Sequence, residues 1–320
     1  MYKQMFRSGL WLAVVLIALP ALAVERGVMI TPGVIYVSPS ADSAKLSDIG
    51  RGREVAVMEH SPGWVNVVGT VDVNIDAADE TAGDRNVTGW IVDKGVITTS
   101  TPDGDKIVFG EAFDSEMEAS RRGGRHGAAQ DALRLYARIP EYFPQSPLAA
   151  EAAYRAADIR WQIEAEDAAT RPSSRERDPA LRYQIDEDYM RKVMKKFPHT
   201  KWADLAAYHL IENKICGDWE AAAKCPEMEA GIYIKYADEH PQSPKAPEAL
   251  YKAAWRYSAL IQIYTAGNDS KKADESAVRA LSVAKRLTSQ FPDDTDWSDR
   301  GVRLIYMVQN KMPTWGNGVQ

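Results

Sequence analysis

Apolar side chains recur at helical spacing around four prolines, Pro144, Pro198, Pro241 and Pro292. A ring-bearing residue precedes each proline: Phe143, Phe197, His240 and Phe291. Apolar residues stand five and eight positions before it: Ile139 and Tyr136, Val193 and Met190, Tyr236 and Tyr233, Leu287 and Ala284. Others stand ten and thirteen positions after it: Tyr154 and Ala157, Tyr208 and Ile211, Tyr251 and Ala254, Val302 and Ile305. Because these steps follow the helical period, each unit predicts a helix, a proline-containing turn and a second helix.

The four units recur every 43 to 54 residues, which is typical of a helical repeat array whose units bury one another's apolar faces. Ser146 and Ser243 precede a proline, and Thr200 takes their place in the second unit. These three residues are predicted to cap the second helices. Small residues follow in the first three units: Ala149, Ala152, Ala203, Ala206, Ala246 and Ala249. Trp297 and Arg300 replace them in the fourth unit, as expected of a terminal repeat that meets solvent.

The Phe-Pro-x-Ser-Pro-x-Ala-x-x-Ala turns resemble the tetratricopeptide superfamily. They are most similar to its periplasmic members in outer-membrane assembly lipoproteins and cell-division coordinators. The resemblance covers residues 126–311 and implies an array that presents a concave surface to a partner protein. The family repeats every 34 residues or so, so inserts such as residues 167–179 must lengthen helices or loops. Pro140 is expected to kink its helix or end it early.

Residues 28–97 follow a different pattern, in which short β-rich runs alternate with glycine- and proline-containing turns. The runs are Val34–Val37, Glu54–Met58, Trp64–Val68 and Gly89–Val92. Short alternating strands with this punctuation predict a small all-β barrel. The fold class expected for the whole chain is therefore multidomain, with a small all-β barrel followed by an all-α repeat array.

The order of these runs resembles the bacterial SH3-like domain. Its pieces are Gly52-x-x-Val55-x-Val57, then Gly63-Trp64, and a closing Gly89-Trp90. The resemblance spans residues 24–97. Two departures matter: the family's Asn-Val-Arg-x-Gly-Pro stretch reads Ile35-Tyr36-Val37-Ser38-Pro39, and an acidic insert, residues 72–86, replaces a tight turn.

Three aromatic residues of this region are candidates for ligand binding, because flat rings on a barrel surface bind peptide or glycan strands. We expect Tyr36 and Trp64 to be the candidate ligand-binding residues, although packing is an equal alternative for Trp64. Trp90 is expected to be a core residue that closes the barrel.

A polar stretch, Thr98–Asp105, has no apolar period and is expected to be a linker. Residues 108–121 could form a helix that docks on the array. The expected division is a signal peptide (1–23), an SH3-like barrel (24–97), a linker with a docking helix (98–125), the helical repeats (126–311) and a C-terminal tail (312–320). The two modules are expected to fold separately.

The N-terminus predicts export. Lys3 and Arg7 precede the apolar residues 10–19, and Ala21-Leu22-Ala23 follows as a cleavage site. A membrane anchor is the weaker interpretation, since ten helical residues cover only about half of a ~30 Å hydrocarbon core. No cysteine stands directly after the cleavage site, so we expect no lipid anchor. After cleavage we expect no membrane span and a location in the periplasm or outside the cell.

Cleavage would change the net charge from −6 to −8, because it removes Lys3 and Arg7. An acidic protein argues against nucleic acid or an anionic membrane as the main partner. The two cysteines, Cys216 and Cys225, are expected to form a disulfide across one turn between repeat units, since exported proteins favour paired cysteines. Their spacing fits neither a redox motif nor a zinc site.

No catalytic motif, cofactor fingerprint or metal-ligand spacing is present, so we expect no enzyme activity, no cofactor and no metal site. The acidic clusters at 164–167 and 186–188 are expected to be solvated faces. Tyr154, Tyr208 and Tyr251 occupy the same repeat position, which favours core packing over a binding stripe.

Two functional interpretations follow from the resemblances, and one stands apart. The first is a non-enzymatic envelope adaptor or scaffold that binds a protein through the array, and a peptide, a glycan or a second protein through the barrel. The alternative is a subunit that binds peptidoglycan and recruits a cell-wall hydrolase or synthase. An enzyme with an unrecognised site is the more distant possibility.

Overall fold

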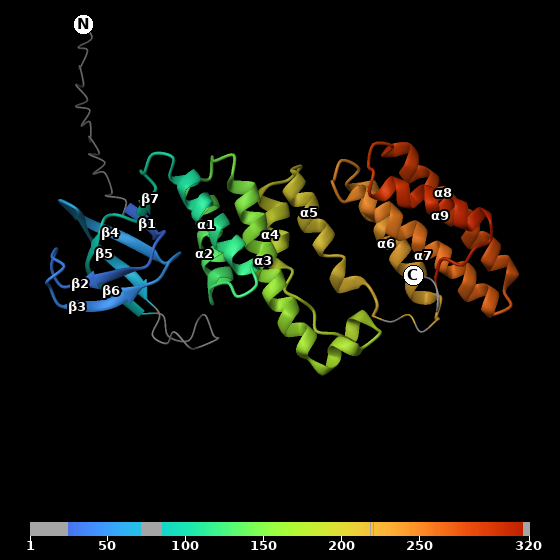
Figure 1. The fold of residues 1–320 in the computed structure, drawn as a ribbon, viewed down its shortest axis with the longest axis horizontal. Helices are drawn as coiled ribbons and strands as arrows, with labels where there is room; N and C mark the ends of the chain where they lie inside the picture. Colours follow the sequence, from blue (N-terminus) through green and yellow to red (C-terminus); the bar gives the residue numbers. More distant parts are fainter. Residues whose placement is uncertain (1–24, 72–84, 218, 220, 316–320) are drawn as a thin grey trace, which may run out of the picture.

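The computed structural model describes residues 25–71, 85–217, 219 and 221–315. The expected signal peptide and most of the acidic insert lie outside the described residues. The chain forms a β-sheet followed by a row of helices (Figure 1). No helix among the described residues is long and apolar enough to cross a membrane.

The N-terminal region is one antiparallel sheet. Its seven described strands are β1 (Glu25–Met29), β2 (Gly33–Tyr36), β3 (Lys45–Ile49), β4 (Glu54–Ser61), β5 (Trp64–Val71), β6 (Arg85–Val92) and β7 (Val96–Thr98). Their order across the sheet is β3-β2-β6-β5-β4-β1-β7. The strands β2 and β3 lie on the side away from the helices (Figure 1). The sequence therefore predicted the β-rich character of this region correctly.

Alternation along the strands buries one face of the sheet. In β5, Val65, Val67 and Val71 are buried, whereas Trp64 and Asn66 point to the other face. The core of the sheet consists of apolar residues from six strands: Met29, Ile35, Ile49, Val55, Val57, Val65, Val67, Val71 and Ile91.

The helical region begins directly after the sheet. Its described α-helices are α1 (Gly104–Ser120), α2 (Ala128–Tyr142), α3 (Ala149–Thr170), α4 (Asp188–Lys196), α5 (Lys201–His209), α6 (Lys224–Glu239), α7 (Ala246–Ala266), α8 (Ser270–Gln290) and α9 (Trp297–Gln309). Short 3₁₀ turns are η1 (Pro172–Arg175), η2 (Pro179–Leu181) and η3 (Glu212–Lys214). The insert at residues 167–179 thus lengthens α3 and the irregular segment that follows it.

The four proline-marked turns share one backbone geometry. Phe143, Phe197, His240 and Phe291 end α2, α4, α6 and α8, with φ angles of −126°, −126°, −127° and −129°. Each backbone N–H donates to the carbonyl four residues earlier, on Ile139, Val193, Tyr236 and Leu287. The residues expected at these repeat positions are therefore equivalent in the structure, which confirms the helical repeats.

Burial also follows the repeat. The residues eight and five positions before each proline are buried in all four units, and so are the small residues of the first three units. Val302 departs from the pattern, because its side chain in α9 is 56% exposed. Val302 lies in the fourth unit, and no helix after α9 packs against it among the described residues.

Two local predictions differ from the structure. Thr200 caps α5 by accepting from the N–H of Ala203, as expected. Ser146 and Ser243 instead accept from the N–H two residues later and fix a tight turn, so that α3 and α7 begin three residues after the serine. Pro140 does not end α2 early, because the helix continues to Tyr142.

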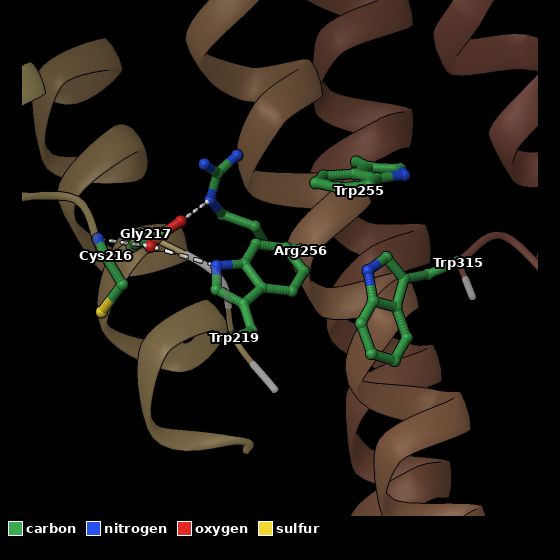
Figure 2. A pocket seen from close by; sticks show the side chains of 7 residues that line it. Cys216, Gly217, Trp219, Trp255, Arg256 and Trp315 are labelled. Carbon is green, nitrogen blue, oxygen red and sulfur yellow. Dashed lines mark hydrogen bonds and ion pairs between the residues drawn. The ribbon is translucent and has the colours of Figure 1, made fainter. Parts of the chain in front are cut away.

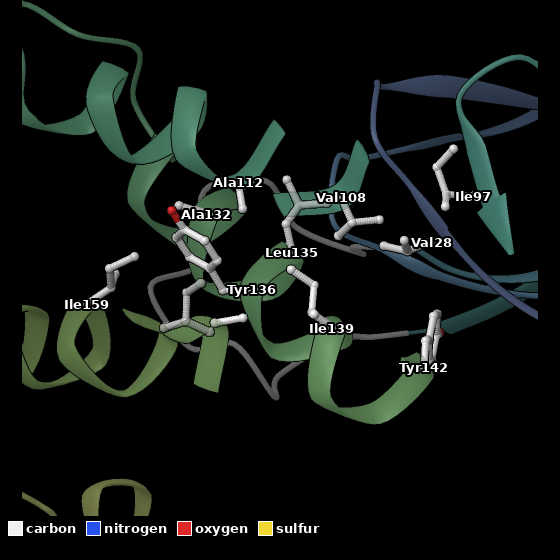
Figure 3. Close-up of a cluster of buried hydrophobic side chains, with 12 residues drawn as sticks. Val28, Ile97, Val108, Ala112, Ala132, Leu135, Tyr136, Ile139, Tyr142 and Ile159 are labelled. Atoms are coloured by element: carbon white, nitrogen blue, oxygen red, sulfur yellow. The ribbon is translucent and has the colours of Figure 1, made fainter. Parts of the chain in front are cut away.

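The sheet and the first helices share one core (Figure 3). Val28 of β1 and Ile97 of β7 are buried with Val108 of α1 and Leu135 of α2. The stretch expected to be a linker contributes Thr98 to β7, and α1 begins at Gly104. Whether the two regions fold separately stays a prediction, but their apolar contact is continuous.

Candidate functional site

The outer face of the sheet carries the aromatic residues selected from the sequence. Tyr36 of β2 pairs with Trp90 of β6, and Trp90 pairs with Asn66 of β5. Residues directly opposite one another in antiparallel strands share a face. Trp64 lies one row away, opposite Val92, on that same face. We call Tyr36, Trp64, Trp90 and Val92 the aromatic face.

Tyr36 and Trp64 are in contact. Their ring centroids are 5.7 Å apart, with an angle of 85° between the ring planes, which is an edge-to-face arrangement. Both side chains are half-buried. The structure thus brings together the two residues named as ligand candidates and leaves part of each ring exposed.

Trp90 is not a core residue, so that expectation is wrong. It is half-buried and belongs to the aromatic face, whereas its neighbours Gly89 and Ile91 are buried. Successive side chains of a strand point to opposite faces of the sheet, so Trp90, which lies between the inward-facing Gly89 and Ile91, points outward. Gly89 itself is required by close packing: a Cβ there would lie 2.5 Å from the Tyr36 carbonyl oxygen.

The histidines and acidic clusters of the array have structural partners. His240 Nδ1 lies 2.7 Å from an Asp204 carboxylate oxygen, across the junction of α5 and α6. His209 Nε2 lies 3.1 Å from Asp158 Oδ1. Glu164, in the first acidic cluster, accepts from the Tyr183 hydroxyl and ties the irregular segment to α3. Among the described residues no group of three or more His, Cys, Asp or Glu could hold a metal ion.

The repeated tyrosines join successive units. Tyr154 lies 5.4 Å from Trp202, Tyr208 lies 5.0 Å from Tyr236, and Tyr251 lies 5.4 Å from Trp297 (centroid distances). Each partner belongs to a different proline-marked unit. All three tyrosines are half-buried and pack against buried clusters. Burial raises the pKa of the Tyr208 phenol above its usual range, so this side chain stays neutral.

A second site, which the sequence analysis missed, lies beside the disulfide. Cys216 and Cys225 are bonded, as expected. The disulfide encloses Trp219, whose ring centroid is 5.2 Å from that of Trp255 and 5.9 Å from that of Trp315. These three indoles border an open hollow of about 310 Å³ (Figure 2). We call it the tryptophan pocket.

A buried carboxylate organises the tryptophan pocket. Glu229 of α6 is 1% exposed. It accepts from the Cys216 N–H at 2.8 Å, the Trp219 Nε1–H at 3.2 Å and the Arg256 Nε–H at 2.6 Å. The Arg256 guanidinium also lies over the ring of Tyr233, at 4.5 Å from its centroid. A tryptophan inside a ten-residue cysteine loop was the one sequence signal for this site.

Comparison with known proteins identifies no relatives. No family model matches the chain, and no curated protein matches it. Similar solved structures include the DHF58 filament, with 15% identity, a TM-score of 0.24, and coverage of 65% of this chain and 94% of that one. Another is the de novo designed helical repeat protein DHR64, with 15% identity, a TM-score of 0.22, and coverage of 65% and 92%. TM-scores this low do not establish a shared fold.

Proposed function

We propose that the chain is an exported, non-enzymatic adaptor of the cell envelope. Its helical array binds a protein partner, and its sheet, which resembles an SH3-like domain, binds a peptide, a glycan or a second protein. The Cys216–Cys225 disulfide supports export, since disulfides persist in oxidising compartments.

The observation that carries this proposal is the aromatic face. Tyr36, Trp64 and Trp90 are only half-buried, and Val92 beside them is 44% exposed. The core of the sheet is on the other face, and the helices pack at the β1 and β7 side. A partly exposed aromatic surface that lies outside the buried clusters of the described residues is a feature of recognition sites.

The array supports a second binding surface. Phe113 and Met117 of α1 are exposed, and so are Val302 and Tyr306 of α9, one helical turn apart. Exposed pairs of large apolar residues on the first and the last described helix favour contact with a protein partner.

The alternative is a peptidoglycan-targeting subunit that recruits a wall hydrolase or synthase. The aromatic face favours it as well, because indole faces stack against sugar rings. Sedimentation of the full chain with purified peptidoglycan sacculi separates the two. Strong co-sedimentation that Trp64→Ala abolishes would favour the targeting subunit. The adaptor requires no strong co-sedimentation, and it predicts that its ligand is crosslinked at the aromatic face.

A further inference from the structure

The tryptophan pocket is assembled from three segments that are distant in the sequence. Trp219 comes from the disulfide-closed loop, Trp255 from α7, and Trp315 from the residues after α9. Figure 2 shows the three indoles converging with Arg256 beside them. Ligand sites are typically hollows that are lined by large aromatic side chains and a few polar groups.

The walls of the pocket are held in place before any ligand arrives. Glu229 fixes both the Trp219 indole and the Arg256 guanidinium through its two carboxylate oxygens. The Trp255 Nε1–H donates to the carbonyl of Thr314 at 3.2 Å, and this bond anchors the segment that carries Trp315. Fixed side chains reduce the entropy that a ligand must overcome on binding.

The charges of the pocket disfavour an ionic ligand. Glu229 and Arg256 form an ion pair of 2.6 Å, so the buried negative charge is already compensated. Among the described residues that line the hollow, no second carboxylate would balance a cation beside the guanidinium, and an anion would lie near Glu229. A neutral ligand meets neither cost.

The hydrogen-bonding groups narrow the ligand further. The indole N–H groups of Trp219 and Trp255 already donate to Glu229 and Thr314, so these rings offer their faces. Arg256 is only 8% exposed; its Nε–H donates to Glu229 and its Nη1 donates to the Lys252 carbonyl, so a ligand could use only the other N–H groups of the guanidinium. A purely apolar ligand would offer these groups no acceptor. A sugar ring has an apolar C–H face for stacking and hydroxyl groups that accept from a guanidinium.

We propose that the tryptophan pocket binds a neutral sugar ring, stacked on the half-buried indoles of Trp255 and Trp315 and hydrogen-bonded by Arg256. A hollow of about 310 Å³ is near the lower limit for ligand pockets and suits one or two rings. An extended proline-rich peptide requires a longer groove. This site is separate from the aromatic face, and the inference does not depend on the proposed function.

The test is an NMR titration of the full chain with ¹⁵N-labelled indoles. The probes are cellotetraose and chitotetraose, which are neutral oligosaccharides without and with N-acetyl groups, and a decaproline peptide. We expect an oligosaccharide to shift the indole signals of Trp219, Trp255 and Trp315, each assigned by a Trp→Phe variant. The signals of Trp64 and Trp90 report separately on the aromatic face.

Two variants make the test specific. Trp315→Ala should weaken oligosaccharide binding about tenfold or more, the effect expected of an aromatic anchor. Trp202→Ala, a matched tryptophan of α5 outside the pocket, should leave the affinity unchanged. The titration itself uses the wild type, and only the assignment needs the conservative Trp→Phe variants to fold. Shifts with decaproline alone, shifts confined to Trp64 and Trp90, or no shifts with either oligosaccharide would overturn the proposal.

Discussion

The Tyr142 hydroxyl donates a hydrogen bond of 3.2 Å to the backbone carbonyl of Gly27, a residue 115 positions earlier in the chain. The bond is buried and connects α2 to β1. It lies in the core that the sheet shares with α1 and α2. The sheet therefore rests on the first helices through directional as well as apolar contacts, and the two regions should stabilise each other.

Glycine substitutions test this junction. Gly52 has φ +75°, and a Cβ there would lie 2.6 Å from Cβ of Arg134 on α2. Gly63 has φ +77°, but nothing lies within 4 Å of its added Cβ. Gly63→Ala should cost about 1–2 kcal/mol of unfolding free energy from backbone strain alone. Gly52→Ala should cost roughly 1–3 kcal/mol more, because overpacking at α2 is added.

Urea unfolding of both variants provides the measurement. Equal losses of stability would mean that α2 does not pack against Gly52 in solution, and the shared core would then be in doubt.

The pH dependence of stability should report on the same junction. Glu54 of β4 contacts Arg26 of β1 and Arg138 of α2. Burial would raise the pKa of Glu54, but the hydrogen bond from Arg26 and the charge of Arg138 hold it below the ordinary value of 4.5. Since the folded pKa is the lower one, Glu54 stabilises the fold above about pH 4.5, and this contribution is lost as the pH falls through the folded pKa.

Denaturation at pH 7 and at pH 3 should therefore show a smaller acid-induced loss of stability for Glu54→Gln than for the wild type. Glu59→Gln, at an exposed position of the same strand, is the control and should behave as the wild type does. If the two variants lose the same stability on acidification, the assigned role of Glu54 is wrong.

The disulfide should stabilise the array and shape the tryptophan pocket. Cys216 and Cys225 are nine positions apart. On the chain-entropy account, replacing both with Ser should lower the unfolding free energy by roughly 2.5–3 kcal/mol. Guanidinium denaturation measures this loss, and non-reducing peptide mapping should recover the linked pair. Free thiols in protein recovered from the periplasm would contradict the assignment.

Truncation of a repeated tyrosine tests the packing between units. Tyr208 is half-buried against Tyr233 and Tyr236, so Tyr208→Ala should cost about 3 kcal/mol, the lower end of the range for aromatic core residues. Tyr306, which is 61% exposed on α9, is the matched control, and its Ala variant should stay within about 0.5 kcal/mol of the wild type. Unchanged thermal stability of Tyr208→Ala with loss of partner binding would instead mark a binding stripe.

The repeat array could be predicted from the sequence because its signals are local. Phe143 and its three counterparts end helices with the same backbone angles, as the spacing of the apolar residues required. The capping prediction was less accurate, since Ser146 fixes a turn that precedes its helix. Local patterns locate elements better than they locate helix ends.

The binding surfaces depend on contacts that no local pattern records. The contact between Tyr36 and Trp64 requires β2, β6 and β5 to be neighbours, and the sequence does not give that order. Trp90 alternates with the buried Ile91 along β6, so it lies on the outer face. The tryptophan pocket joins Trp219 to Trp315 across almost a hundred residues, so only the folded chain reveals it.

The most direct test of the adaptor proposal is site-specific photocrosslinking in cells that express the full chain. A photoreactive residue at Val92, opposite Trp64 on the aromatic face, should form an adduct with an envelope protein, peptide or glycan. Trp64→Ala should abolish this adduct, and a photoreactive residue at the exposed Lys94 should give none. An adduct that persists in Trp64→Ala, or no adduct at Val92, would contradict the proposal that the aromatic face binds a ligand.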